Sequence, residues 1–324
     1  MVILAVYVLV MVFLATTKSI ELTADAPEYE RMFMLNDNVL IELTTEPSFI
    51  YLSRIVQALG GSIVTMFFIY AIVTIPAKMK MLYNLTPYIF TALIIYIPVY
   101  FEVHDMIQIR AAAAAMFLLW FIFFIVQKKY IPSVLLLICA TLCHYSAIVY
   151  LPFLFIANRQ LGYYGRIIIA TLVPFCFAMY LLKLDWFSLI PDFLVWGKID
   201  VYKESTEKGT WDDLSPLYLN IYFIAKCAVL YLCLYYYDFL VKKNPFAPIL
   251  INLLAVSICF LTSMATIPVI ASRISDMFGI VDCIVFTFCL YIVSPQWIAR
   301  TAISVAGLYM LIWNMFMTEY FSPK

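Results

Sequence analysis

The chain has 324 residues, of which 65% are hydrophobic and 12% are charged, and its formal net charge is zero. This composition excludes an ordinary soluble domain, and the lack of net positive charge argues against a nucleic-acid partner. Apolar runs of about 17–25 residues, the length that crosses a bilayer core, recur along the chain. The sequence therefore predicts an all-α polytopic membrane protein, with residues 1–324 forming a single integral membrane domain.

We expect about nine full transmembrane helices, which cover residues 2–17, 60–76, 82–101, 109–127, 166–183, 217–240, 246–269, 277–294 and 300–317. Alternate gaps between them are almost purely basic, for example at Lys78 with Lys80 and at Lys128 with Lys129, whereas most acidic residues fall in the other gaps. Because basic loops remain in the cytoplasm, the N-terminus is predicted to be cytoplasmic and the C-terminus to lie outside.

The segment after the first span, residues 18–59, is predicted to lie outside the membrane. A helix is expected to start near Asp25, because Pro27 suits the first turn of a helix. Steps of four residues then place Asp25, Tyr29 and Phe33 on one face. Asp25 either caps this helix or offers a carboxylate that takes a proton from a sugar hydroxyl.

Two further stretches are expected at the outer surface. Residues 47–59 are amphipathic and are predicted to form a helix that lies along the membrane. Residues 184–216 form the largest outer loop, which contains Trp186, Trp196 and Trp211. These tryptophans either anchor the membrane interface or stack on sugar rings.

The stretch 131–157 departs from the regular pattern, because Lys129 before it and Arg159 after it both indicate the cytoplasm. Its 27 residues are too few to cross twice, since two helical crossings need about 40. We therefore predict a re-entrant pair of half-helices with His144 at the tip. If the stretch is instead one plain span, every later loop changes side.

Three cationic or titratable residues are predicted near the outer rim of the bilayer. Arg110 begins one apolar run, Arg273 follows another, and His144 lies at the predicted hairpin tip. A guanidinium binds phosphate oxygens through two parallel hydrogen bonds, so these residues together suggest one anionic ligand such as a lipid diphosphate. Lys226 either joins them or extends its ammonium group outward to water.

The neighbouring acidic residues support a plainer alternative. Arg110 lies close in sequence to Asp105, and Arg273 lies close to Asp276. Each arginine could therefore pair with its neighbouring carboxylate or reach water instead of binding a ligand.

Candidates for the group that accepts a proton from a substrate are Glu102, His104 and Asp105, which compete with Asp25. The sequence has no glycine-rich phosphate loop, no HExxH and no Gly-x-Ser-x-Gly. We therefore predict neither a metal site nor a cofactor.

Several motifs occur in a set order along most of the chain. They are Asp25-x3-Tyr29-x3-Phe33, Glu46-Pro47-Ser-Phe, Gln108-Ile-Arg110-Ala-Ala, Lys128-Lys129, His144-Tyr-Ser146-Ala147 and the late Arg273. In this order they resemble the EpsG family of Wzy-like exopolysaccharide polymerases. Members of the family usually open with a further span, so the resemblance implies a chain that is short at its N-terminus.

The resemblance implies glycosyl transfer at the outer face of a bacterial inner membrane. The donor would be a growing glycan on undecaprenyl diphosphate, and the acceptor a single lipid-linked repeat unit. The product would be an exopolysaccharide, capsule or O-antigen chain, and a chain-length regulator is a further expected partner. Neither ATP nor a nucleotide sugar is needed, because the donor is already activated.

The expected catalytic residues are Arg110, Arg273, His144 and Asp25. The expected substrate contacts are Tyr29, Glu102, Asp105, Gln108, Lys226 and Asp276. A transporter or flippase of lipid-linked sugars is the first alternative, although the chain lacks the paired broken segments typical of such proteins. Another outer-face transferase, either a glycan ligase or an O-acyltransferase, is the second.

Overall fold

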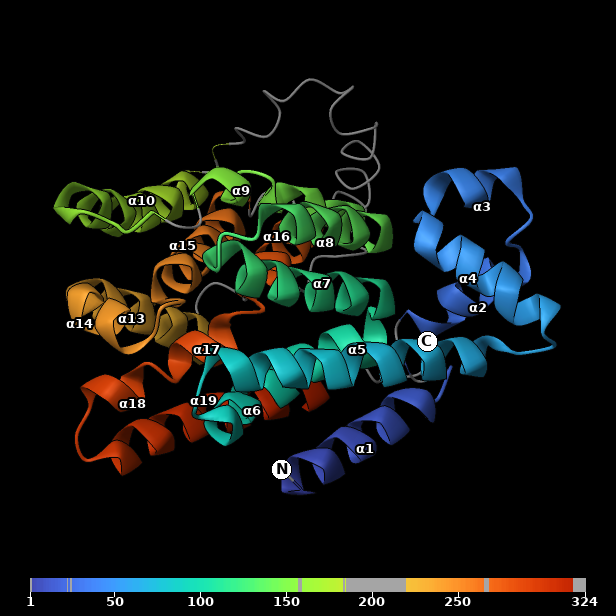
Figure 1. Ribbon diagram of the computed structural model, residues 1–324, viewed down its shortest axis with the longest axis horizontal. Helices are drawn as coiled ribbons and strands as arrows, with labels where there is room; N and C mark the ends of the chain where they lie inside the picture. The colour runs from blue at the N-terminus through green and yellow to red at the C-terminus, as the bar shows by residue number, and fades with distance from the viewer. Residues whose placement is uncertain are drawn as a thin grey trace. The chain divides into compact units, whose positions relative to one another are not determined.

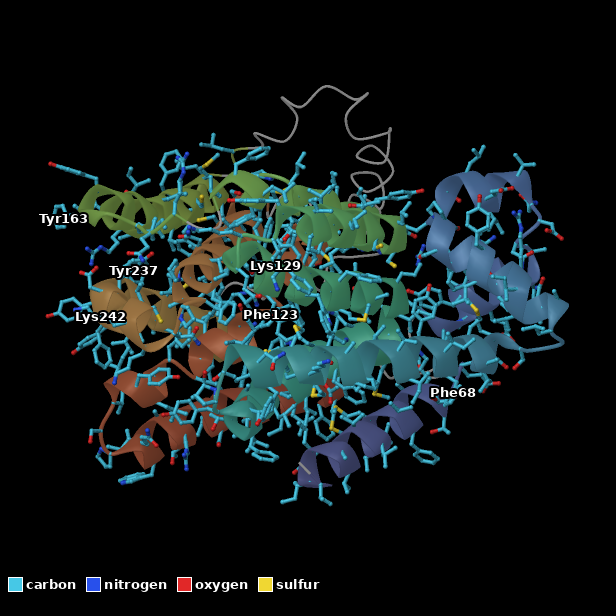
Figure 2. All side chains as sticks on the ribbon, viewed as in Figure 1. Phe68, Phe123, Lys129, Tyr163, Tyr237 and Lys242 are labelled. Carbon is cyan, nitrogen blue, oxygen red and sulfur yellow. The ribbon has the colours of Figure 1, made fainter. Side chains whose placement is uncertain are left out.

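The computed structural model describes residues 2–21, 23, 25–156, 159–182, 184, 220–264 and 268–316, and the regular elements within these ranges are helices. The chain divides into two compact units, and Figure 1 labels their helices. The first comprises Met1–Ala157 with Val293–Lys324, and the second comprises Asn158–Ile292. Exposed apolar side chains such as Phe68 and Tyr163 project from the helix surfaces, as expected for a protein in contact with lipid (Figure 2).

The first unit begins with four helices: α1 (Val2–Thr16), α2 (Ala26–Met34), α3 (Val39–Thr44) and α4 (Pro47–Ala58). The helix expected after Asp25 is therefore confirmed as α2, and Tyr29 and Phe33 are buried on one of its faces. The side chain of Asp25 makes no capping hydrogen bond. The helix expected over residues 47–59 is confirmed as α4.

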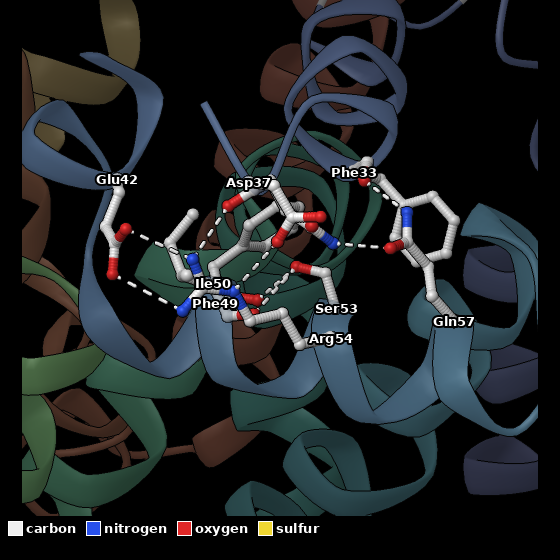
Figure 3. Close-up of polar contacts among 9 residues, drawn as sticks. Phe33, Asp37, Glu42, Phe49, Ile50, Ser53, Arg54 and Gln57 are labelled. Atoms are coloured by element: carbon white, nitrogen blue, oxygen red, sulfur yellow. Dashed lines mark hydrogen bonds and ion pairs between the residues drawn. The ribbon is translucent and has the colours of Figure 1, made fainter. Parts of the chain in front are cut away.

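Polar side chains on α4 join it to the end of α2 and to α3 (Figure 3). Arg54 lies 3.1 Å from the Glu42 carboxylate and donates a 3.1 Å hydrogen bond to the main-chain oxygen of Asn36. Gln57 donates a 2.6 Å hydrogen bond to the main-chain oxygen of Phe33. These bonds give partners to the carbonyl group of Phe33, in the last turn of α2, and to that of Asn36 just after the helix.

Three helices long and apolar enough to cross a membrane follow in sequence. They are α5 (Ile63–Leu85), α6 (Ile89–Tyr96) continued by the π-helical η1 (Ile97–Ile107), and α7 (Ile109–Val126). The helix α5 extends beyond its predicted end at residue 76, so Lys78 and Lys80 lie within it and not in a loop. Both charges are accommodated, because Lys78 pairs with Asp105 and Lys80 lies 5.4 Å from the centre of the Trp120 ring.

The stretch predicted as a hairpin contains α8 (Tyr130–Cys143), the 3₁₀ turn η2 (Tyr145–Tyr150) and α9 (Phe153–Ile156). The break falls at His144, whose backbone is extended with φ −156° and ψ 117°. The helix α8 packs against α7. The re-entrant course of this stretch through a membrane stays a prediction.

The C-terminal helix of the first unit, α19 (Gln296–Phe316), packs against α6 and η1. Gly307 allows close approach, because a Cβ atom there would clash with the main-chain oxygen of Ile94. In the last turn of α19, Asn314 donates a 2.6 Å hydrogen bond to the main-chain oxygen of Pro98. This bond gives a partner to a carbonyl group where the α6 backbone widens into the π-helix.

The second unit contains α10 (Tyr163–Leu181), α13 (Ile221–Tyr235), α14 (Tyr237–Lys243), α15 (Ala247–Ser263), α16 (Pro268–Gly279), α17 (Asp282–Phe286) and α18 (Cys289–Ile292). The helix α15 packs against α10, α13 and α16. The chain bends by 86° between α13 and α14, and by 52° between α16 and the α17–α18 segment.

The described part of the chain has five helices that could each cross a membrane, or up to seven if each bent pair is one span. The expected number of about nine is therefore not confirmed. Two predicted spans correspond to shorter apolar helices, α1 with 15 residues and α15 with 17. The predicted outer loop 184–216 lies almost entirely outside the described residues.

Candidate functional site

A buried cluster of one carboxylate and two nitrogen bases lies in the first unit, and we call Glu46, Arg110 and His144 the central cluster. One carboxylate oxygen of Glu46 binds Nη1 of Arg110, and the other lies 2.9 Å from Nδ1 of His144. The Glu46 side chain is 7% exposed, that of Arg110 19% and that of His144 14%. Residues separated by almost one hundred positions thus converge on a single carboxylate.

Each member of the central cluster lies at the start or the end of a helix. Glu46 precedes α4 in an extended conformation, and Pro47 begins that helix. Arg110 lies in the first turn of α7, directly after the break at Gln108. His144 is the extended residue between α8 and η2. These positions direct the three side chains to one place while the helices beyond them stay regular.

Two aromatic rings lie beside the Arg110 guanidinium. The centre of the Tyr29 ring is 5.3 Å from it and that of Phe49 is 6.0 Å away. A cation at this distance is attracted to the ring face. Nε of Arg110 is buried and has no hydrogen-bond partner among the described residues.

Glu46 is held in its ionised form by its partners. Burial alone would raise its pKa, but the hydrogen bond with His144 and the charge of Arg110 outweigh burial and lower the pKa from 4.5 to about 2. For the neighbouring Tyr29, burial raises the pKa above its usual value of 10.0, so this side chain remains a neutral phenol.

The ionised carboxylate determines the tautomer of the neutral His144 ring. A carboxylate can only accept hydrogen bonds, so Nδ1 of His144 must carry the hydrogen that lies between the two groups. In a neutral ring the other nitrogen, Nε2, is then an acceptor that is able to take a proton. The same arrangement would stabilise the imidazolium that forms after proton transfer.

Asp105, predicted to contact the substrate, is instead enclosed in a second polar cluster. Both of its carboxylate oxygens lie 2.6 Å from Nζ of Lys78. Thr74 and Tyr96 donate hydrogen bonds of 3.2 and 2.7 Å to the same carboxylate. The side chains of Lys78 and Asp105 are 0% and 1% exposed, so Asp105 has no surface to offer a ligand in this structure.

The other residues predicted near Arg110 also have defined surroundings. Glu102 accepts a 3.1 Å hydrogen bond from Asn314 of α19. His104 is fully buried with its ring centre 5.5 Å from that of Tyr100, and neither ring nitrogen has a partner among the described residues. Gln108 is half-buried and forms the break before α7.

Arg273, Lys226 and Asp276 all belong to the second unit. Lys226 forms a 2.8 Å ion pair with the buried Asp282 and donates a 2.7 Å hydrogen bond to Ser257, so its ammonium group is already paired. Arg273 and Asp276 lie on α16 and are partly exposed.

Sequence reasoning missed two residues that organise these clusters. Glu46 appeared only as part of the Glu46-Pro47 motif, although a carboxylate directly before a helix-starting proline in an apolar segment could have drawn attention. Lys78 was assigned to a loop, because sequence patterns give no information on which charges pair. Among the described residues, no group of three or more His, Cys, Asp or Glu side chains is placed to hold a metal ion.

The comparison with known families gave one match. The model of a family described as the EpsG family matches residues 1–323, which is essentially the whole chain. No curated protein and no solved structure matched the chain.

Proposed function

Because the chain belongs to the EpsG family, we propose that it joins undecaprenyl-diphosphate-linked oligosaccharide repeat units into a polysaccharide at the outer face of the bacterial inner membrane. Family membership and the apolar helices indicate a multi-pass membrane protein related to polysaccharides, and the family is associated with glycosyltransferase-like polymerase activity. We further propose that the donor is lipid-linked, that the acceptor is a lipid-linked repeat unit and that transfer takes place at the outer face.

The central cluster is the observation that carries this proposal. Arg110 has five N–H donors, of which Nη1 binds Glu46, and Nε has no partner among the described residues. The guanidinium also shares a hydrogen bond with Tyr29, and the donors that remain suit the oxygens of a diphosphate, which a guanidinium binds in pairs. Negative charge grows on this leaving group as the glycosidic bond breaks, and a fixed cation stabilises it.

His144 supplies the matching acid–base group in the proposed reaction. The bond between the donor sugar and the diphosphate oxygen breaks, and that oxygen keeps the electron pair. The acceptor hydroxyl forms the new glycosidic bond, and its proton moves to Nε2 of His144. Glu46 orients the ring and offsets its new positive charge. We therefore assign the acceptor base to His144 in preference to Asp25, Glu102 or the enclosed Asp105.

The remaining predicted residues enter as separate proposals. Tyr29 is only 3% exposed, so its proposed role is to position the Arg110 guanidinium beneath the sugar or the lipid headgroup. Arg273, on α16 of the second unit, is partly exposed and is a separate candidate for binding an anionic ligand. Gln108 and Asp276 are candidate substrate contacts because their side chains are also partly exposed. Lys226 instead forms an ion pair with Asp282.

The decisive experiment supplies the full chain, reconstituted in liposomes, with a synthetic lipid-diphosphate repeat unit and no nucleotide sugar. We expect a ladder of products. Arg110→Ala and His144→Ala should each reduce ladder formation at least tenfold, since each removes a group that acts on the reacting atoms. Arg273→Ala tests the second arginine in the same assay.

The matched control is Arg300→Ala, which removes an exposed arginine on α19 and should leave the ladder unchanged. Full activity of both Arg110→Ala and His144→Ala would contradict the assignment of the site. Repeat units that stay single but cross the bilayer would indicate a transporter.

A further inference from the structure

An apolar cavity of about 160 Å³ lies between α4, α5, α7 and α8 of the first unit, and we call it the lateral cavity. It is lined by Ser48, Leu52, Ile69, Tyr70, Val73, Thr74, Ala113, Met116, Phe117 and Cys143. Almost all of its surface is apolar, and the hydroxyl of Thr74 is already bound to Asp105. An apolar cavity of this kind does not hold water well and favours an apolar guest.

The lateral cavity opens on the flank of a helix that could cross a membrane. Val73, on α5, contributes to its lining and is 53% exposed. Ile69 and Leu52, which also line the cavity, are half-buried. A lipid chain could therefore enter from the side without passing through water.

The lining of the cavity includes close sequence neighbours of all three residues of the central cluster. Cys143 in its lining directly precedes His144, and Ala113 lies on α7 three residues after Arg110. Residues three positions apart on a helix share a face. Ser48 follows Glu46 by two residues in the first turn of α4. The cavity is thus lined by residues from the same helix ends that carry the central cluster.

We propose that the lateral cavity holds the isoprene unit that is bonded to the diphosphate of the lipid carrier. This inference rests on the proposed function and names the part of the substrate that the site recognises. A cavity of about 150 Å³ accommodates a six-carbon ring, so the lateral cavity has room for one five-carbon unit. Tyr70, Met116 and Phe117 offer the polarisable surfaces that suit an alkene.

The position of the cavity favours an isoprenoid over the acyl chain of a phospholipid. In a prenyl diphosphate the first carbon is bonded directly to the diphosphate oxygen, so apolar atoms begin beside the charge. In a phospholipid a glycerol and an ester group separate the phosphate from the first methylene group. Arg110 lies one helical turn before Ala113 of the lining, and His144 directly follows Cys143, so the short spacing favours the isoprenoid.

The test measures binding of farnesyl diphosphate to the full chain in lipid nanodiscs, with inorganic diphosphate and phosphatidic acid as comparison ligands. Ala113→Leu fills the cavity with a larger apolar side chain. We expect it to weaken farnesyl diphosphate binding at least tenfold and to leave inorganic diphosphate binding unchanged. Ala302→Leu, the same substitution at an exposed position on α19, is the matched control and should change neither.

Val73→Trp provides a second variant, because a half-exposed residue at the opening can be enlarged without repacking the interior. It should also weaken farnesyl diphosphate selectively. Equal binding of farnesyl diphosphate by the two variants and by the unchanged protein would overturn the inference. So would phosphatidic acid that displaces farnesyl diphosphate at equal concentration. The proposed function is tested apart from the cavity by Arg110→Ala: inorganic diphosphate binding that this variant leaves unchanged would contradict the proposed function.

Discussion

Glu46 binds a guanidinium through one oxygen and an imidazole through the other, so a single carboxylate sets the orientation of both groups that we assign to catalysis. Its low pKa excludes it as a proton donor near neutral pH and makes it a weak base. Glu46 is therefore a positioning residue in the proposed mechanism. Its contribution is electrostatic as well as geometric, because it offsets the positive charge of its partners.

Replacing Glu46 with glutamine should separate these two contributions. The amide keeps the size of the side chain but carries no charge, so the His144 imidazolium loses its stabilising partner. We expect the rate of ladder formation by Glu46→Gln to fall at least tenfold. The control is Glu28→Gln at an exposed ion pair with Arg31, which should leave the rate within twofold of the original.

The pH dependence of stability offers an independent measurement on the same residue. Folding lowers the pKa of Glu46 from 4.5 to about 2, so its ionic contribution is fully present above about 4.5 and is lost as the pH falls towards 2. We expect the thermal unfolding midpoint in detergent to decrease across this window. The decrease should be smaller in Glu46→Gln, and an identical pH profile for the two proteins would contradict the assignment.

The pair of Lys78 and Asp105 makes a different prediction, because both charges are buried. Removing one partner leaves an unpaired charge in the protein interior, at a cost of about 3–5 kcal/mol. Lys78→Met and Asp105→Leu should each lower the unfolding midpoint and the yield of monodisperse protein. The double variant should recover most of the lost unfolding midpoint and most of the lost yield, because it leaves no charge unpaired. If the destabilisation of the double variant equals the sum of the two single destabilisations, the ion pair does not contribute to stability and the prediction is wrong.

Among the helices, the contact of α19 with α6 depends on the absence of a side chain at Gly307. The nearest atom is a main-chain oxygen of Ile94, which cannot move aside as a flexible side chain can. Gly307→Ala should therefore push the helices apart and lower the unfolding midpoint, with a destabilisation of about 1–3 kcal/mol. Gly165→Ala on α10 is the control, because a Cβ atom there meets only the Leu161 side chain at 3.2 Å.

The elements were predictable where a strong apolar run or a helix-start motif marked them. The helices α2, α4, α7 and α10 lie close to their predicted ranges because proline starts, amphipathic spacing or a long apolar stretch indicated each one. The end of α5 was missed because two lysines suggested a loop. A single lysine in an apolar run is costly, but a buried ion pair reduces that cost, and the partner lies 27 residues away.

The candidate site was predictable only in part for the same reason. Arg110 and His144 stand out as charged or titratable groups beside apolar runs, and they lie together in the structure. The role of Glu46 depends on a contact between residues 98 positions apart, which no local pattern reveals. The environment of Asp105 was likewise decided by a distant lysine.

At the scale of the whole molecule, the three candidate spans between α4 and α8 predict that the two flanking segments lie on opposite sides of the membrane. Asp37 in the first segment is 92% exposed, and Lys129 in the second is also exposed. Asp37→Cys should react with an impermeant maleimide in intact spheroplasts, whereas Lys129→Cys should react only after permeabilisation. The unsubstituted protein gives the background of its native cysteines, and labelling of both variants from one side would contradict the predicted topology.

The pairing of Lys78 with Asp105 also has a consequence for biosynthesis. The ribosome delivers α5 to the translocon before the π-helical η1 exists, so the ammonium group initially has no carboxylate to meet. A lysine costs about 2.5–3.5 kcal/mol at the centre of an inserting helix and less towards its end, where Lys78 lies in α5. That cost is offset only once a further 27 residues have emerged. From this order of synthesis we expect α5 and η1 to enter the lipid together, as one helical hairpin, and not one after the other.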